Sequence, residues 1–200
     1  MAEDLVRPAR YTADSLLEVA VDVFTVRGYD GTSMGDLARA AGMSKSSIYH
    51  HVSGKEHLLR LALERALDPL FAVLDEPAAQ TGPAIDRLEH VVRREVQVLV
   101  DNLPYVTLLL RVRGNTATER WALDRRRAFD AQVTELASVA AGEGALRSDI
   151  DPALVTRLLF GMINSITEWY RPGTTEGNGS DSGTDVGDAA VALAFDGLRT

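Results

Sequence analysis

The sequence lacks cysteine altogether and holds only two lysines and two tryptophans in 200 residues. Without cysteine it can form no disulfide, thiolate metal site or catalytic thiol. No apolar run is long enough to span a bilayer, and the polar first segment, MAEDLVRPARYT, does not have the pattern of a signal peptide. The sequence therefore predicts a cytoplasmic protein that makes no use of a membrane.

Catalytic signatures are also scarce. No P-loop, His-Glu-x-x-His or dinucleotide-binding fingerprint is present, and His90 has no catalytic partner visible in the sequence. We therefore predict that the protein is not an enzyme and uses no cofactor and no metal.

The net charge of −8 is unevenly distributed along the chain. Residues 1–65 carry 8 Lys and Arg against 9 Asp and Glu, whereas residues 66–200 carry 13 against 20. The acidic excess thus falls mostly in the later part of the chain. A locally basic face in the first part remains compatible with phosphate binding.

Apolar residues recur at helical spacing throughout, and nothing alternates with period two for long enough to predict a sheet. Several helix starts are marked by capping residues, which are Thr12, Ser33 with Asp36, Thr116 with Glu119, and Asp151 before Pro152. The fold class predicted is all-α, without internal repeats.

The pattern divides the chain into two parts. Residues 1–58 form a first domain, with three short helices within 12–58, and residues 59–200 form a second. A connecting helix runs to about Leu74. The Gly- and Ser-rich segment 172–184 is predicted to be flexible, and a short final helix follows over 191–198.

Residues 33–57 have the pattern of a helix-turn-helix. Gly42 falls where the tight turn needs a positive φ, and Ser44 caps the next helix. Ile48 and Val52 are expected to face the core, which leaves on the outer face Lys45, Ser46, Ser47, Tyr49 and His50. A short helix with such an outer face suits the DNA major groove.

The stretch YTADSLLEVAVDVFTVRGYDGTSMGDLARAAGMSKSSIYHHVSGKEHLL resembles the TetR family of one-component transcriptional regulators. Its GYDGTSM, DLARAAG and SKSSIYHHV blocks follow the family's order, and Val52 replaces a frequent Phe. The resemblance implies an N-terminal helix-turn-helix domain that binds double-stranded DNA at a pseudo-palindromic operator. It also implies a C-terminal helical domain that binds a small effector and forms a homodimer. Repression released by the effector is the expected function.

The resemblance also assigns roles to single residues of the first domain. Phosphate contacts are expected from Thr32, Ser33, Tyr49 and Lys55, and groove contacts from Lys45, Ser46, Ser47 and His50. An alternative for Tyr49 is packing between helices, and His51 is expected to be half-buried with a structural role.

A second resemblance concerns the stretch ALRSDIDPALVTRLLFGMINSITEWYRPG, which is similar to the acyl-CoA-responsive branch of the family, whose members include fatty-acid, cholesterol-catabolism and phenylacetate regulators. It implies an acyl-CoA thioester as effector and places Trp169 and Arg171 near the ligand. Trp169 equally suits a dimer interface.

An effector pocket should be apolar with a few polar groups. Phe129 lies on an apolar helix stripe that also carries Arg126, which could meet an anionic ligand or extend to the surface. Arg113 could bind ligand or cap a helix end, and Trp121 could flank the pocket or fill the core. In the helix after Pro152, Met162 belongs to a wide apolar arc and Asn164 is polar among apolar neighbours.

Two other functions remain open from the sequence. A sensor of drugs or antibiotics would keep the DNA-binding domain and change only the effector. A helical protein-interaction module would use the same helix-turn-helix to bind protein instead of DNA.

Overall fold

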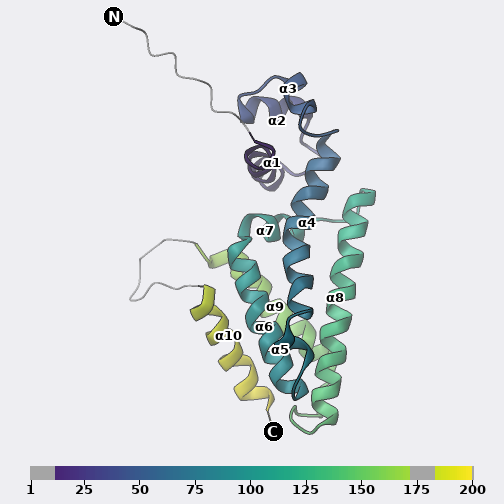
Figure 1. Cartoon of the computed structure of the whole chain (residues 1–200), viewed down its shortest axis with the longest axis vertical. Helices are drawn as coiled ribbons and strands as arrows, with labels where there is room; N and C mark the ends of the chain where they lie inside the picture. The colour runs from purple at the N-terminus through teal and green to yellow at the C-terminus, as the bar shows by residue number, and fades with distance from the viewer. Residues whose placement is uncertain (1–11, 172–182, 200) are drawn as a thin grey trace, which may run out of the picture. The chain divides into compact units, whose positions relative to one another are not determined.

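The computed structural model describes residues 12–171 and 183–199, which form ten α-helices and no strand (Figure 1). The all-α prediction is confirmed. The helices are α1 (Ala13–Arg27), α2 (Met34–Ala41), α3 (Lys45–Tyr49), α4 (Lys55–Leu74), α5 (Pro77–Gln80), α6 (Ala84–Asp101), α7 (Leu103–Arg111), α8 (Ala117–Gly142), α9 (Pro152–Trp169) and α10 (Gly183–Leu198).

The chain divides into two compact units, Met1–Ala62 and Leu63–Thr200, which we call the head and the body. The division falls inside α4, whereas the sequence placed it after residue 58. The head extends further because the buried side chains of Leu58, Leu59 and Ala62, on the first turns of α4, belong to it.

Local sequence signals build the head. Thr12 and Ser33 each form a capping box with the residue three positions later, which confirms both predicted helix starts. Gly42 ends α2 with φ 62° and ψ 28°, the left-handed conformation that the turn requires. The turn brings α3 against α2, where Ile48 is fully buried and Val52 is 4% exposed, as predicted.

The body is held together by apolar faces of its longer helices. α6 buries Leu88, Val92 and Val96, and α8 buries Phe129, whose ring lies 5.7 Å from that of Phe71 and 5.9 Å from that of Phe160. The predicted caps Thr116 and Asp151 start α8 and α9. The body therefore has one continuous core to which α4, α6, α8 and α9 all contribute.

α10 runs alongside α6 (Figure 1). Gly187 permits a close approach, because a Cβ there would lie 3.3 Å from the Arg93 carbonyl oxygen. Arg93 also forms an ion pair with Asp188 at 2.7 Å. This helix begins at Gly183, earlier than the predicted 191, so residues 183 and 184 of the expected flexible segment are helical, and 172–182 lie outside the described residues.

Within residues 12–171 and 183–199, no helix is both long enough and apolar enough to cross a bilayer.

Candidate functional sites

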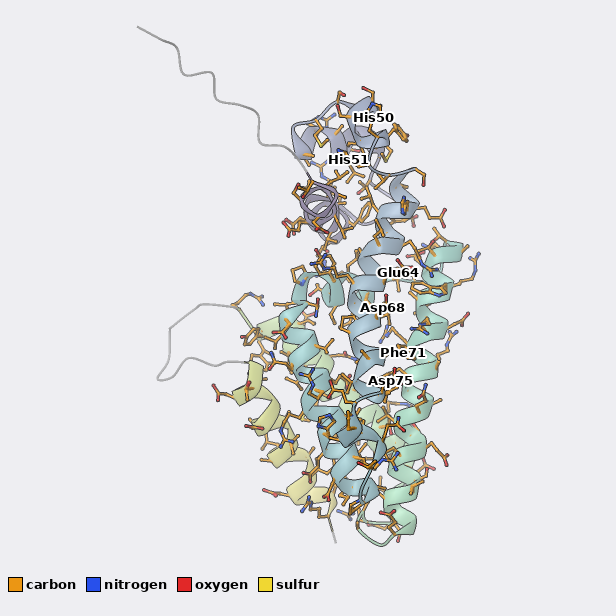
Figure 2. All side chains as sticks on the ribbon, in the orientation of Figure 1. His50, His51, Glu64, Asp68, Phe71 and Asp75 are labelled. Carbon is orange, nitrogen blue, oxygen red and sulfur yellow. The ribbon has the colours of Figure 1, made fainter. Side chains whose placement is uncertain are left out.

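The outward surface of α3 carries polar side chains. Lys45, Ser46, Tyr49 and His50 are exposed, with Tyr49 at 54%, while Ser47 is half-buried. Figure 2 shows His50 at the end of this helix. Ser44 starts it, since its hydroxyl accepts a hydrogen bond from Ser47 N–H at 3.1 Å and lies 2.9 Å from the Ser46 hydroxyl. The exposure of Tyr49 argues against its alternative role in packing between helices.

Lys45 also approaches the start of α2. A Cβ built on Gly35 would lie 3.0 Å from Lys45 Cε, 3.3 Å from its Nζ and 3.5 Å from Ser33 Oγ. The amino group of Lys45 on α3 and the Ser33 hydroxyl that caps α2 therefore both lie close to the position that a side chain at Gly35 would occupy. A cation and a hydroxyl placed this closely can together contact one phosphate group.

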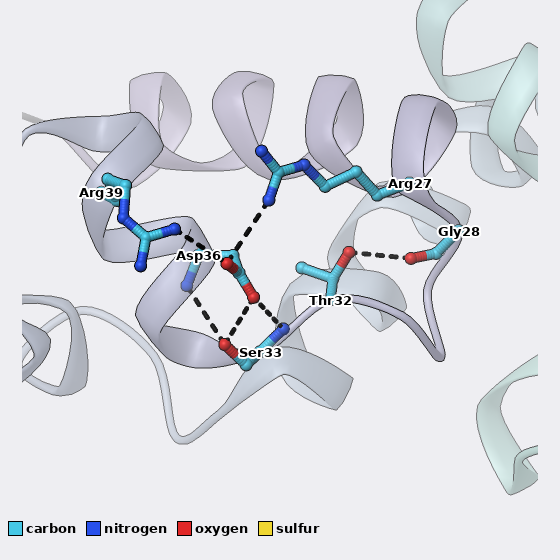
Figure 3. Close-up of polar contacts among 6 residues, drawn as sticks. All are labelled: Arg27, Gly28, Thr32, Ser33, Asp36 and Arg39. Carbon is cyan, nitrogen blue, oxygen red and sulfur yellow. Dashed lines mark hydrogen bonds and ion pairs between the residues drawn. The ribbon is translucent and has the colours of Figure 1, made fainter.

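Beside them, Asp36 lies in a network of donors (Figure 3). Its carboxylate accepts hydrogen bonds from Ser33 Oγ at 2.6 Å and Ser33 N at 3.0 Å, and it pairs with Arg39 at 3.0 Å and Arg27 at 3.4 Å. The Ser33 hydrogen bonds, helped by Arg39, lower the pKa of Asp36 to about 2. Two arginines thus offset the only acidic charge on α2.

Two predicted phosphate contacts instead point inward. Thr32 is 2% exposed and its hydroxyl donates to the Gly28 carbonyl at 2.7 Å. Lys55 Nζ donates to the carbonyls of Tyr29 at 3.0 Å and Thr32 at 2.9 Å, and lies 4.3 Å from the centre of the Tyr29 ring. Both side chains stabilise the turn between α1 and α2, which does not fit their predicted role at the phosphates.

The side chain of His51 is more exposed than the sequence predicted. It was expected to be half-buried, but it is exposed at the end of α3 beside His50 (Figure 2).

The segment Gly31-Thr32-Ser33-Met34-Gly35 has the spelling Gly-x-Ser-x-Gly of a hydrolase nucleophile. That motif requires a serine on a strand-to-helix turn, with a histidine as base. Ser33 instead caps α2 and shares its hydroxyl with Asp36. In this protein the serine of the motif therefore caps helix α2 and is not placed as a nucleophile.

The body contains a small cavity of about 70 Å³ between α4, α6, α7, α8 and α9. Three of the predicted ligand residues, Arg126, Phe129 and Asn164, line it together. The rest of its wall is mostly apolar and consists of Ala66, Leu70, Glu95, Val98, Leu99, Val106, Leu109, Leu110, Asp130 and Phe160.

Glu95 is the residue of this cavity that sequence reasoning missed. It is 8% exposed, and its Oε2 is buried with no hydrogen-bond partner among the residues that the structure describes. Burial, reinforced by the nearby Asp130, raises the pKa of Glu95 well above its usual value, although Arg126 opposes the shift. A signal was present, because Glu95 interrupts the apolar stripe of Leu88, Val92 and Leu99 on α6.

Asp130 lies one helical turn beyond Arg126. The residue as a whole is exposed, but its carboxylate is partly desolvated at the rim of the cavity. This desolvation raises the pKa of Asp130, with Arg126 acting against it. The cavity therefore combines one cation with two carboxyl groups whose pKa values are both raised by desolvation.

The other predicted ligand residues lie elsewhere. Met162 and Trp169 line a separate groove of about 400 Å³ between α9 and α10. Arg171 donates to the carbonyls of Tyr170 and Glu168 at the end of α9, and Arg113 is exposed with its N–H donating to Glu119 at 3.4 Å. Trp121 is half-buried outside the cavity wall.

A neighbouring cluster on α4 and α8 is structural. The Arg125 guanidinium lies 3.8 Å from the centre of the Phe71 ring and 3.9 Å from the carboxylate of Asp68, two α4 residues seen in Figure 2. This contact covers the apolar ring with an aligned cation and stabilises the packing of α8 on α4.

Comparison with known proteins agrees with this arrangement. Residues 16–62 match the family described as bacterial regulatory proteins, tetR family. Residues 81–198 match the tetracyclin repressor-like C-terminal domain. The chain belongs to the TetR family. Proteins of this family are DNA-binding transcriptional regulators and not enzymes.

Relatives within the TetR family cover nearly the whole chain. The transcriptional repressor KstR2 of Rhodococcus jostii is 30% identical over 188 residues, which are 92% of this chain and 90% of that protein. The crystal structure of SCO3833, a TetR-family member from Streptomyces coelicolor, is 59% identical with a TM-score of 0.87 and covers 97% of this chain and 94% of its own. AibR, solved with isovaleryl coenzyme A and operator DNA, is 24% identical with a TM-score of 0.74, over 92% of this chain and 97% of its own, which shows a shared fold.

Proposed function

We propose that this TetR-family regulator represses transcription by inserting α3 into the major groove of its operator. Direct contacts are assigned to Lys45, Ser46, Ser47, Tyr49 and His50, with Ser33 and Ser44 at the flanking phosphates. The observation that carries this proposal is the α3 surface, where the polar side chains are outward and Ile48 is fully buried beneath them. Thr32 and Lys55 contribute by fixing the turn before α2.

A homodimer would present two such helices to successive major grooves about one helical turn apart. Large apolar side chains on α9 and α10 support this assembly, since Leu158 is 62% exposed, Trp169 56% and Leu193 77%. Apolar surface of this kind marks an interaction site.

The effector we propose is an acyl-CoA thioester whose acyl end enters the body cavity. Support comes from the wall of Phe129, Phe160 and Leu99, which suits an alkyl group, and from AibR, a protein of the same fold that holds isovaleryl coenzyme A. A cavity of about 150 Å³ admits benzene, so about 70 Å³ takes only the end of an acyl group until the walls move apart. The ligand would act by preferring the state of the protein that fits the operator less well.

The DNA-binding proposal is tested with Lys45→Ala combined with Tyr49→Ala. An operator is first selected from random duplexes with the unaltered protein, and affinity is then measured at fixed salt. The double variant should bind about 10- to 100-fold more weakly, because a phosphate contact and a groove contact are lost. Its fold should persist, since both side chains are exposed.

Arg127→Ala is the matched control, because it removes an exposed cation of α8 and should leave affinity unchanged. Unaltered DNA binding by the Lys45 and Tyr49 double variant, with the dimer intact, would contradict the contacts assigned to α3. Failure of the unaltered protein to select any operator would instead favour a protein-interaction module.

The effector class is tested by thermal shift against CoA thioesters, the matching free acids and cationic drugs. A ligand at about 100 times its Kd adds roughly 2.7 kcal/mol to the free energy of unfolding. Stabilisation by thioesters and not by free acids supports the acyl-CoA proposal. A response to a cationic drug alone replaces it with a drug sensor.

A further inference from the structure

The body cavity has one polar feature that an unsubstituted acyl chain does not explain. Glu95 Oε2 is buried and unpaired, while the groups around it are mostly aliphatic and aromatic. A buried oxygen without a partner costs free energy, and native structures retain few of them. A ligand that supplies a hydrogen-bonding group at this point would recover that cost.

The neighbouring charges restrict the chemistry of that group. A ligand cation would be attracted by Glu95 and Asp130 but repelled by Arg126, and burial makes a charge on Glu95 itself costly. A ligand carboxylate would meet Arg126 but would also face the two acids. A neutral hydroxyl avoids both conflicts.

A hydroxyl also matches a carboxyl group in either protonation state. Protonated, Glu95 presents one O–H donor and acceptor lone pairs, and a hydroxyl both donates and accepts. Asn164, across the same cavity, offers a further donor and acceptor.

We infer that Glu95 is the specificity-determining residue of the effector cavity, and that it selects a ligand whose apolar chain ends in a hydroxyl group. This inference rests on the acyl-CoA function proposed above and narrows it to hydroxylated acyl groups. Sites that hydrogen-bond a ligand hydroxyl discriminate strongly against the analogue lacking it, because the protein group is then left unpaired.

The test compares four CoA thioesters that differ only at the chain end, which are hexanoyl, 6-hydroxyhexanoyl, 6-aminohexanoyl and hexanedioyl. Affinity is measured by calorimetry with the full-length protein. The hydroxyl compound should bind about tenfold more tightly than hexanoyl-CoA and more tightly than both charged compounds. A preference for the amino or the dicarboxylic thioester would overturn the inference, and so would equal binding of the hydroxyl and methyl ends.

Two variants separate recognition from folding. Glu95→Met removes the polar group and should abolish the tenfold preference, so that hexanoyl-CoA and 6-hydroxyhexanoyl-CoA bind this variant with about equal affinity. Glu95→Gln keeps a donor and an acceptor at similar volume and should retain most of the preference. Circular dichroism checks that both are folded. If the preference survives in Glu95→Met, Glu95 does not contact the ligand and the inference fails.

A second probe set lacks the nucleotide and consists of hexan-1-ol, hexylamine and hexanoate. Thioesters that bind without regard to the chain end leave the acyl-CoA function standing and overturn the role of Glu95. If no thioester binds but hexan-1-ol binds and this binding depends on Glu95, the role of Glu95 stands and the acyl-CoA function is overturned. If neither the thioesters nor the nucleotide-free compounds bind, both the acyl-CoA function and the role of Glu95 are overturned.

Discussion

The head and the body use the same chemical group in opposite ways. Asp36 in the head is surrounded by donors, and the hydrogen bonds from Ser33 hold its pKa near 2. Glu95 in the body is enclosed by apolar side chains, and burial raises its pKa. A carboxylate that receives hydrogen bonds stays charged and orders a helix start, whereas burial away from donors makes the charged form of the other carboxyl group costly.

The location of the two carboxyl groups follows from the roles we propose for the two units. A surface that contacts DNA needs side chains held in place at the exterior, and the head achieves this with caps and a turn encoded within a few residues. A cavity that holds a small molecule needs groups that converge from several helices. The comparison therefore predicts different consequences when residues of the two units are changed.

The largest expected effect comes from Phe129→Ala. Phe129 is 2% exposed and contacts Phe71 and Phe160, so its loss should lower the free energy of unfolding by about 3–5 kcal/mol. Urea denaturation measures this. Val139→Ala on the same helix, where the side chain is 40% exposed, should change it by less than about 0.5 kcal/mol. A loss below about 1 kcal/mol in Phe129→Ala would mean that the body core does not centre on this ring.

The only two lysines of the chain, Lys45 and Lys55, form a matched pair within the head. Lys55→Met loses two charge-assisted hydrogen bonds to backbone carbonyls and should lower the free energy of unfolding by about 1–3 kcal/mol. Lys45→Met should leave stability nearly unchanged and instead reduce the salt dependence of operator binding, with the slope of log K against log salt falling by about 0.9. If the salt slope falls in Lys55→Met with stability intact, Lys55 is a phosphate contact after all.

The two carboxyl groups should also give opposite pH dependence. Asp36 has a lowered pKa, so its contribution to the free energy of unfolding is complete above about pH 3.8 and is lost as the pH falls toward about 2. Glu95 has a raised pKa, so stability is complete below its ordinary value of 4.5 and declines as the pH rises above it.

Unfolding free energies measured between pH 2 and pH 8 test this. Asp36→Asn should flatten the acid limb and Glu95→Gln the alkaline one. Asp130 adds to the alkaline decline and Arg126 opposes it, so Glu95→Gln should reduce the decline without removing it. An alkaline limb identical in Glu95→Gln and the unaltered protein would show that Glu95 is charged in the folded state.

The smallest expected effect is that of Gly35→Ala. The new Cβ would lie 3.0 Å from Lys45 Cε, so the flexible lysine side chain has to shift away from residue 35. Operator affinity should fall a few-fold, while the helix gains up to about 1 kcal/mol from replacing glycine. Measuring affinity and thermal stability on the same sample separates the two changes, and unchanged affinity would show that the position of Lys45 over Gly35 is unimportant.

The sequence predicted the head well because its signals are local. Ser33 and Asp36 are three residues apart and Gly42 follows its helix directly, so spacing alone implies the caps and the turn. The same reasoning failed for Lys55, whose partner Tyr29 lies 26 residues earlier, because spacing does not say whether a lysine points inward.

The cavity was predicted only in part. Arg126 and Phe129 share one face of α8, which helical spacing reveals, but Glu95 joins them from α6 only through tertiary packing. Met162 and Asn164 are two positions apart on α9, so about 200° of rotation separates their side chains. Met162 lines the groove beside α10, whereas Asn164 lines the cavity. The polarity of the two residues alone does not show which of these sites each one reaches.

The two compact units meet within α4, between Ala62 and Leu63, and not in a loop. A cut at this point would leave the last four carbonyls of the head and the first four N–H groups of the body without their helical hydrogen-bond partners. A head expressed on its own therefore needs several further residues of α4 or a new helix cap. Gene fusions that exchange heads or bodies need to join the two parts within this helix without interrupting its hydrogen bonds.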